Sequence, residues 1–178
     1  RPLFSKINKF YDIDNYDPHN LNLNKKWKLI YKFIQQFTYY WKRKIISKYK
    51  DTGRLLDIGC GSGEFAEYMD KKGWSVTAQD SFYNYDGNNK NIEFVDSLLK
   101  INSSSKFEII TLWHSLEHIH DINNLFISID KYLVNNGALI ICVPNINAPE
   151  KKFFNKNWAP FDAPRHLYHF NISSLKRL

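Results

Sequence analysis

The chain has 178 residues, of which 43% are hydrophobic and 16% aromatic, and it carries a formal net charge of +7. This composition is typical of one globular domain with a buried core and excludes a largely disordered chain. No apolar run approaches the roughly 20 residues that span a membrane, and no signal peptide is visible. The two cysteines, Cys60 and Cys142, form no disulfide framework, so we expect free thiols and a cytoplasmic location.

The positive charge is concentrated in residues 1–50, which hold 12 Lys/Arg and 3 Asp/Glu. We interpret residues 1–50 as an irregular segment followed by an amphipathic helix, and residues 51–178 as a separate domain. From Asn24 to Lys50 apolar residues recur every three or four positions between lysines, which predicts the helix. Such a basic helix can meet nucleic acid, an anionic membrane or a phosphorylated substrate, or it can be a solvated face.

Strand and helix patterns alternate after this segment. Short apolar runs predict five strands, at Arg54–Ile58, Trp74–Gln79, Ile92–Val95, Phe107–Trp113 and Ala138–Val143. Helical periodicity predicts helices at Glu64–Lys72, Asp121–Val134 and Ile172–Leu178. Alternation of this kind implies an α/β fold with a mostly parallel sheet covered by helices on both faces. Ligands of such sheets bind beyond the carboxyl ends of the strands.

A glycine-dense turn follows the first strand and is the most informative segment, Asp57-Ile58-Gly59-Cys60-Gly61-Ser62-Gly63-Glu64. Its glycines have no Cβ atom, so a ligand can approach the backbone closely. The dinucleotide fingerprint is G-x-G-x-x-G, and here Glu64 takes the place of its third glycine. A carboxylate at that position opposes a pyrophosphate but tolerates a cationic or neutral cofactor. This disfavours a nicotinamide-dependent dehydrogenase.

Acidic residues end the next two predicted strands. Asp80, followed by Ser81, lies 17 residues after Gly63, a spacing that suits a carboxylate accepting both hydroxyls of a ribose. The pair Asp96-Ser97 ends the third strand, where it can bond the amino group of an adenine. For Asp80 and Asp96, a helix N-cap or turn position is the alternative interpretation.

Four segments carry a family resemblance. Asp57-x-Gly59-x-Gly61-x-Gly63 resembles motif I of the class I S-adenosylmethionine (SAM)-dependent methyltransferases. Phe107–Ile119, with Trp113-His114 and the turn Leu116-Glu117-His118, resembles their motif IV. Leu133–Asn145 resembles the segment that leads into their fifth strand, with Asn136 where the family often has a glycine. Asp162–Phe170 resembles a D-x-P-R-H-x-x-x-F element of bacterial methyltransferases related to the ubiquinone-biosynthesis O-methyltransferases. The resemblance runs from about residue 10 to the end.

This resemblance implies a Rossmann-like class I methyltransferase fold with an N-terminal helical extension. The family usually has seven strands, so we expect the C-terminal strands to be missing from this sequence. An N-terminal lid is also expected, including Phe10, Tyr11 and Tyr16. The implied cofactor is SAM, and the residues expected to bind it are Asp57, Gly59, Cys60, Gly61, Ser62, Gly63, Asp80, Ser81, Asp96, Ser97, Trp113 and His114.

Methyl transfer requires aligned donor and acceptor, and a hydroxyl acceptor also benefits from a base. Histidine suits this role near neutral pH. We favour His118 as the base, with His114 and His166 as further candidates, although each can instead be structural. Arg165 is expected to bind a carboxylate or phosphate of the acceptor, or alternatively to pair with Asp162.

We therefore predict a SAM-dependent methyltransferase that methylates oxygen on a small-molecule, saccharide or lipid-linked acceptor. Two alternatives stay open: an RNA methyltransferase that uses the basic helix, and a non-catalytic SAM-fold binding protein. His114-x-x-Glu117-His118 also matches the H-x-x-E-H pattern of zinc metalloproteases. That pattern requires a helix, whereas His114 follows a predicted strand, so no metal is expected.

Overall fold

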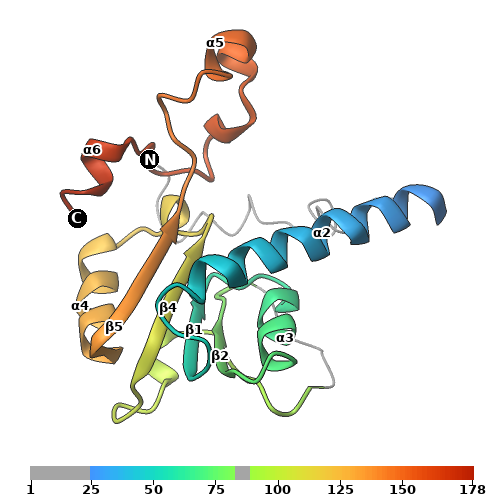
Figure 1. Cartoon of the computed structure of the whole chain (residues 1–178). Helices are drawn as coiled ribbons and strands as arrows, with labels where there is room; N and C mark the ends of the chain where they lie inside the picture. Colours follow the sequence, from blue (N-terminus) through green and yellow to red (C-terminus); the bar gives the residue numbers. More distant parts are fainter. Residues whose placement is uncertain (1–24, 83–88) are drawn as a thin grey trace.

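The computed structural model describes residues 25–82 and 89–178, so the lid predicted at Phe10, Tyr11 and Tyr16 lies outside the described residues. One five-stranded sheet forms the centre of the molecule (Figure 1). Its order is β3-β2-β1-β4-β5, and every neighbouring pair is parallel. The predicted parallel α/β sheet is confirmed. The strands are β1 Arg54–Ile58, β2 Ser75–Gln79, β3 Glu93–Val95, β4 Phe107–Trp113 and β5 Leu133–Cys142.

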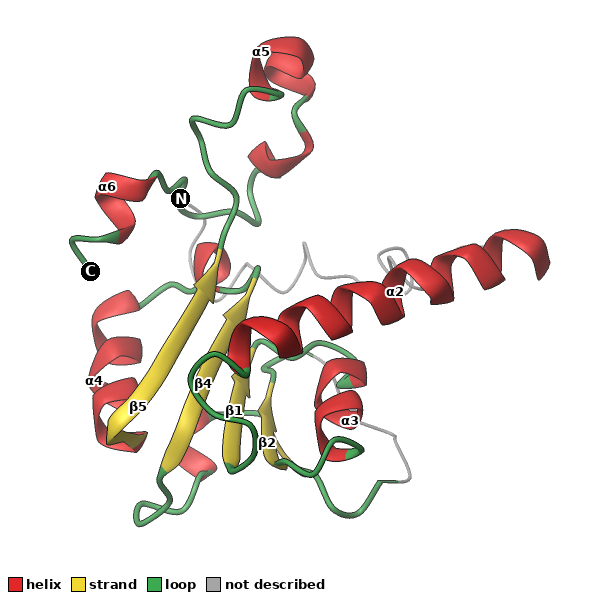
Figure 2. Ribbon diagram, in the orientation of Figure 1, coloured by secondary structure: helices red, strands yellow, loops and turns green. Residues whose placement is uncertain are grey.

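Helices cover both faces of the sheet (Figure 2). Along β1, Leu55 packs into a core with Tyr39 and Met69, whereas its neighbour Leu56 packs into a second core with Leu125. Because successive strand side chains point to opposite faces, β1 and β4 each supply both cores. The first core lies under α2 (Lys25–Ile46) and α3 (Glu64–Asp70), and the second lies under α4 (Ile122–Tyr132).

The fifth strand differs from its prediction. We expected α4 to reach Val134 and the strand to occupy Ala138–Val143, but α4 ends at Tyr132 and β5 begins at Leu133. Leu133 pairs with Phe107 and Ala138 pairs with Ile109, so the residues between them form an irregularity within the strand. The polar residues Asn135, Asn136 and Gly137, which fall between the predicted helix and the predicted strand, lie in this irregularity, so a composition typical of loops occurs inside β5.

The chain after β5 folds back over the carboxyl ends of the strands. It contains the short helices α5 (Lys151–Phe154) and α6 (Ile172–Leu175), and α6 is shorter than the predicted Ile172–Leu178. A parallel bridge joins Asn145 to Phe170, which closes residues 146–169 into a loop. The carboxyl end of the sheet is therefore bordered by this loop on one side and by α2 on the other (Figure 1). In the described part of the chain, no helix combines the length and apolar character needed to cross a membrane.

Candidate cofactor and acceptor sites

The glycine turn between β1 and α3 has left-handed backbone geometry. Gly59, Gly61 and Gly63 have φ angles of 73°, 56° and 80°. A Cβ on Gly59 would lie 2.3 Å from the Cβ of Ser115, whereas a Cβ on Gly61 would meet nothing within 4 Å. Gly59 is therefore required for packing within the protein. Gly61 instead leaves an open space of the kind that a ligand needs beside the backbone.

Asp80 connects the glycine turn to the end of β2. One carboxylate oxygen accepts the backbone N–H of Gly61 and the other accepts the N–H of Phe82, each at 2.9 Å. The carbonyl of Gln79 accepts the N–H groups of Gly59 and Cys60 at 2.8 and 3.0 Å. Asp80 thus lies against the turn at the adjacent strand end, where the sequence predicted a ribose ligand.

A cavity of about 360 Å³ lies between the glycine turn and α2; we call it the cofactor cavity. Asp57 is 3% exposed and accepts the Thr111 hydroxyl at 2.6 Å. Burial raises the pKa of Asp57 to about 6, although the Thr111 bond and the Lys42 charge act in the opposite direction. The lining residues are Tyr31, Ile34, Gln35, Thr38, Tyr39, Lys42, Asp57, Gly59, Cys60, Gly61, Ser62, Glu64, Phe65 and Trp113.

Lys42 brings a positive charge into this cavity. Its ammonium lies 4.9 Å from the centre of the Phe65 ring and 5.0 Å from that of Trp113, which are cation–π distances. Burial lowers the pKa of Lys42, and the nearby Asp57 carboxylate opposes that shift. The cavity therefore presents one basic and one acidic group between aromatic faces. Burial also raises the pKa of the Cys60 thiol, which keeps it protonated.

Glu64 fastens α2 over the cavity. Its carboxylate accepts the side-chain amide of Gln35 at 2.6 Å and the hydroxyl of Tyr39 at 2.8 Å. Burial, reinforced by Glu64, raises the pKa of Tyr39, so the hydroxyl stays a donor. The sequence analysis used Glu64 only to disfavour a pyrophosphate. It missed Gln35, Tyr39 and Lys42, whose spacing of four and three residues places them on one helix face.

A second cavity, of about 570 Å³, lies beyond the ends of β4 and β5; we call it the acceptor cavity. Trp113 lines the cofactor cavity, and the next residue, His114, lines this one. His114 has a positive φ of 55° at the end of β4. The other lining residues are Phe82, Glu117, His118, Pro144, Asn145, Glu150, Trp158, Ala159, Pro160, Asp162, Arg165 and His166. His114, predicted for both catalysis and cofactor binding, thus lies on the acceptor side.

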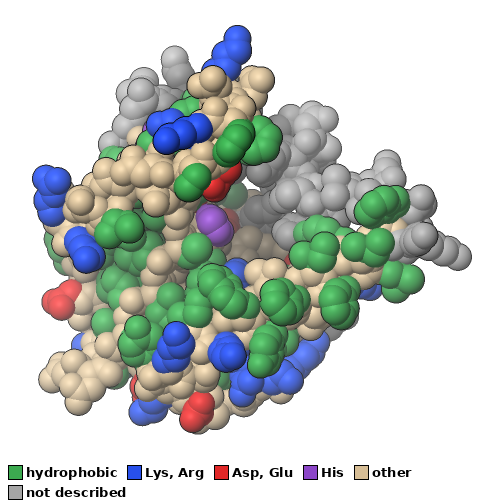
Figure 3. Space-filling model, turned by 45° about the horizontal axis from the view of Figure 1, so that its top comes forward, with side chains coloured by type: hydrophobic (Ala, Val, Ile, Leu, Met, Phe, Trp, Pro, Cys, Tyr) green, Lys and Arg blue, Asp and Glu red, His purple; other side chains and the backbone are tan. Residues whose placement is uncertain are grey.

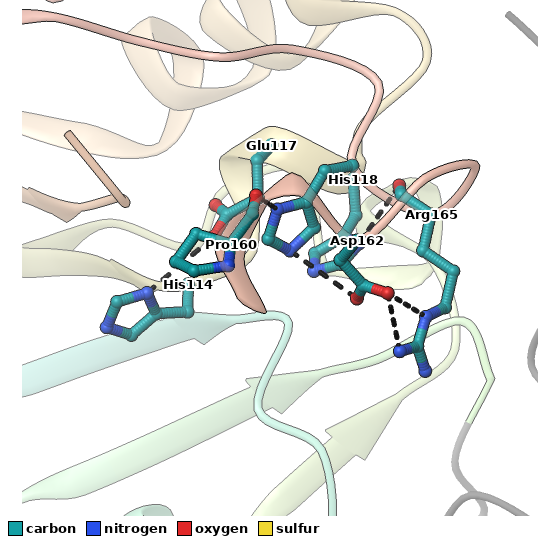
Figure 4. Close-up of polar contacts among 7 residues, drawn as sticks. His114, Glu117, His118, Pro160, Asp162 and Arg165 are labelled. Atoms are coloured by element: carbon teal, nitrogen blue, oxygen red, sulfur yellow. Dashed lines mark hydrogen bonds and ion pairs between the residues drawn. The ribbon is translucent and has the colours of Figure 1, made fainter. Parts of the chain in front are cut away.

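The three predicted catalytic histidines all line this cavity (Figure 4). The rings of His118 and His166 are 4.7 Å apart, edge to face. His118 Nδ1 lies 3.2 Å from the Arg165 carbonyl, and His166 Nδ1 lies 2.7 Å from the Pro160 carbonyl. Because a carbonyl only accepts, each Nδ1 carries the proton and each Nε2 is the acceptor nitrogen of a neutral ring.

The histidines differ in basicity. Burial is the main cause that lowers the pKa of His118. Contacts with the Cys142 thiol, 3.5 Å away, and with the Glu117 carboxylate, 3.7 Å away, raise the pKa of His114 to about 9. At neutral pH His118 is therefore mostly neutral and His114 mostly protonated. Only a neutral histidine can accept a proton.

Glu117 is buried beneath these rings. Its side chain is 1% exposed, and among the residues that the structure describes neither carboxylate oxygen has a hydrogen-bond partner. Ligand atoms of Glu117, His118 and His166 lie within 4.8 Å of one another, so the three side chains offer two nitrogens and one oxygen to a cation. His114 ends a strand and only Leu116–His118 form a 3-10 helix, so the helix required by the H-x-x-E-H pattern is absent here.

The remaining predicted residues occupy the sheet end near β2 and β3. The hydroxyl of Ser81 donates to the Asp96 carbonyl at 3.1 Å. The Asp96 carboxylate pairs with Lys100 at 2.7 Å, and the Ser97 hydroxyl accepts the Leu99 N–H at 3.3 Å. Ser97 is thus the N-cap of the 3-10 helix Leu98–Lys100, the role that was the alternative interpretation for its neighbour Asp96. None of these side chains lines the cofactor cavity among the described residues.

Arg165 also makes its alternative contact. Its guanidinium bonds the Asp162 carboxylate through two nitrogens, at 2.7 and 3.1 Å (Figure 4). His166 Nε2 lies 3.8 Å from the other oxygen of Asp162. The side chain of Arg165 is 16% exposed. The ion pair therefore stabilises the wall of the acceptor cavity that carries His166.

Comparison with known proteins agrees with this geometry. The family model described as a methyltransferase domain matches residues 10–178. The chain belongs to this methyltransferase-domain family. The match supports the predicted class of enzyme, a SAM-dependent methyltransferase, with SAM as its cofactor.

Curated relatives of this methyltransferase-domain chain are distant. The ubiquinone biosynthesis O-methyltransferase of Pelagibacter ubique (strain HTCC1062) is 29% identical over 165 residues, which cover 80% of this chain and 62% of that protein. The protein of the same name from Rickettsia canadensis (strain McKiel) is 26% identical over 113 residues, which cover 57% of this chain and 48% of that protein. The chain thus spans less than two thirds of either relative.

Solved structures share the fold. A SAM-dependent methyltransferase from Archaeoglobus fulgidus superposes with a TM-score of 0.61 at 22% identity. The match covers 86% of this chain and 72% of that structure's chain. The YcgJ protein of Bacillus subtilis superposes with a TM-score of 0.59 at 17% identity. The match covers 75% of this chain and 63% of that structure's chain. The predicted Rossmann-like class I methyltransferase fold is therefore confirmed.

Proposed function

We propose that this chain transfers the methyl group of SAM to a hydroxyl oxygen of an acceptor bound in the acceptor cavity. One observation carries the proposal: Trp113 and His114 are adjacent residues, yet one lines the cofactor cavity and the other lines the acceptor cavity. Donor and acceptor would therefore meet at the end of β4. Such alignment is the main contribution that a protein makes to a displacement reaction.

The residues of the cofactor cavity fit SAM. The open space at Gly61 admits a ligand against the backbone, and Asp80 lies beside it to accept ribose hydroxyls. Lys42 suits the carboxylate of the cofactor, and the buried Asp57 suits its cationic groups. SAM supplies an electrophilic methyl group on a sulfonium. The faces of Phe65 and Trp113, which Lys42 contacts here, also suit such a cation.

His118 is the best-placed base for a hydroxyl acceptor. Its Nδ1 proton is directed at the Arg165 carbonyl, which leaves Nε2 to accept a proton, and its lowered pKa keeps the ring neutral. His166 has the same tautomer through the Pro160 carbonyl and is the second candidate. His114 is protonated at neutral pH and is better suited to binding an acceptor oxygen than to removing a proton.

Methylation at oxygen is also supported by the relatives, which are named O-methyltransferases. We propose a small-molecule, saccharide or lipid-linked acceptor. The acceptor cavity presents Trp158 and Pro160 beside its histidines, a mixture of apolar and hydrogen-bonding groups typical of small-ligand sites. The basic helix α2 keeps an RNA acceptor as the second candidate.

The cofactor assignment can be tested with two alanine variants that differ only in location. Gly61 and Gly73 both have a positive φ, 56° and 87°, and neither would place a Cβ within 3.4 Å of another atom. Both variants therefore carry similar backbone strain. Only Gly61→Ala fills the space in the cofactor cavity, and we expect at least tenfold weaker binding of SAM and S-adenosylhomocysteine by calorimetry.

Gly73→Ala should bind both compounds as the wild type does. Equal affinity of the two variants would refute the placement of the cofactor against Gly61. Failure of the wild type to bind either compound would refute the proposed activity. Transfer itself is measured afterwards by the release of S-adenosylhomocysteine with candidate hydroxyl acceptors.

A further inference from the structure

Helix α2 has two different faces. One face carries Gln35, Tyr39 and Lys42 and lines the cofactor cavity. The opposite face carries an exposed hydrophobic surface at helical spacing, which we call the apolar face of α2: Leu29, Ile30, Phe33, Phe37 and Tyr40. Phe33 is 75% exposed and Phe37 is 64% exposed. In Figure 3 hydrophobic side chains run in a row along this helix, with Lys and Arg at their border.

An apolar face of this kind is unusual on a protein surface that contacts only water. Contiguous exposed hydrophobic patches mark sites of interaction with another protein, a ligand or a membrane. The N-terminal half of α2 extends past the edge of the sheet, so the described core does not cover it (Figure 1). A binding partner from outside the described residues is therefore required to bury the face.

The charge of α2 identifies the partner. The helix contains seven Lys/Arg and no Asp or Glu among its 22 residues. Lys32 is exposed one turn after Leu29, and Lys44 is exposed one turn after Tyr40, so both lysines border the apolar face. A partner that is apolar inside and negatively charged at its surface matches both properties. The surface of a bilayer that contains anionic lipid has this combination.

Two other partners match less well. A second copy of the chain would bring two uniformly positive helices together, and lysine is depleted in such interfaces. Single-stranded RNA would use the positive charge and the aromatic rings, but it offers no contact to the aliphatic side chains of Leu29 and Ile30. The aliphatic residues therefore favour lipid.

We propose that α2 binds peripherally to an anionic membrane surface, with its apolar face in the interface and the bordering Lys32 and Lys44 toward the lipid headgroups. The proposal goes beyond methyl transfer and does not depend on it. Because the two faces belong to one helix, binding would place the cofactor cavity about one helix diameter, roughly 10 Å, from the lipid. An acceptor carried by the membrane would then be within reach of the site.

The test is sedimentation of the protein with vesicles of phosphatidylcholine, alone or with about 30% phosphatidylglycerol. We expect binding to the anionic vesicles only, and weaker binding in about 0.5 M salt because the headgroup attraction is screened. Phe33→Gln/Phe37→Gln should reduce binding at least tenfold. The control is Leu99→Gln/Ile127→Gln, which changes two side chains that are 90% and 66% exposed elsewhere. The control pair should bind as the wild type does.

Three outcomes would overturn the proposal. The first is a wild type that does not sediment with anionic vesicles, and the second is an equal loss of binding in the control pair. The third is a Phe33→Gln/Phe37→Gln variant that binds vesicles normally but loses RNA binding or self-association. Circular dichroism and SAM calorimetry on the same variants report the fold and the cofactor site, so failure of membrane binding is distinguishable from failure of the proposed activity.

Discussion

The contact between Gly59 and Ser115 provides a quantitative test of how the cofactor site is built. A Cβ on Gly59 would lie 2.3 Å from the Ser115 Cβ, far inside van der Waals contact, and the backbone of Gly59 has a φ of 73°. The Gly59→Ala variant therefore loses stability for two reasons. Left-handed geometry costs about 1–2 kcal/mol for a residue with a Cβ, and overpacking costs about 1–3 kcal/mol more. We expect a total loss of about 2–5 kcal/mol.

A double-mutant cycle with Ser115→Gly separates the two causes. Ser115→Gly alone loses the hydrogen bond from its hydroxyl to the Ile58 carbonyl, 2.8 Å, which costs about 1 kcal/mol. In the double variant the clash is absent, so it should be more stable than the sum of the single effects by about 1–3 kcal/mol. Urea unfolding of the four proteins measures this difference. Additivity within about 0.5 kcal/mol would refute the close contact.

Two further predictions concern protonation. For Asp57, the pKa is raised from 3.8 to about 6, so between these values the folded state retains a proton that the unfolded state has released. The free energy of unfolding should therefore fall as the pH rises from about 4 to 6, by about 3 kcal/mol through this group. Asp57→Asn should lack that fall in urea unfolding at several pH values, and identical pH dependence in both proteins would contradict the burial argument. For the histidines, proton NMR titration should give His118 a pKa below 6.5 and His114 a pKa near 9. Loss of each resonance in His118→Gln and His114→Gln assigns the signals, and the reverse order would exclude His118 as the base. The stabilising contribution of the His114 contacts is present below about pH 6.5 and is lost as the pH rises through about 9.

The sheet could be predicted because its signals are local. Each strand is a short apolar run, and four of the five have bounds within one residue of the prediction. The start of the fifth strand could not be predicted, because Leu133 and Ala138 are separated by a polar irregularity whose pairing with β4 is a tertiary contact. The polar composition of these residues is typical of a loop, so the sequence does not indicate that they continue the strand.

The sequence analysis predicted the part of the cofactor cavity that the strand ends form, but not the part that α2 forms. The glycine turn and Asp80 follow apolar runs, so their position in a parallel sheet follows from the order of the elements. Gln35, Tyr39 and Lys42 belong to a helix whose packing direction is not local information. Their periodicity predicts a shared face, but it does not show what that face packs against. In the structure the face that carries all three lies against the protein together with the buried Ile46, whereas Phe33 and Phe37 are exposed.

The orientation of α2 connects the proposed activity with the proposed membrane-binding surface. The C-terminal half of α2 adds Tyr39 and Ile46 to the first core, but Phe33 and Phe37 do not pack inward. Instead, Glu64 binds Gln35 and Tyr39 on the polar face, and the resulting orientation directs Phe33 and Phe37 outward. The hydrogen bonds that close the cofactor cavity therefore also determine which side of α2 faces its surroundings. The site and the surface are two consequences of one contact between α2 and the first turn of α3.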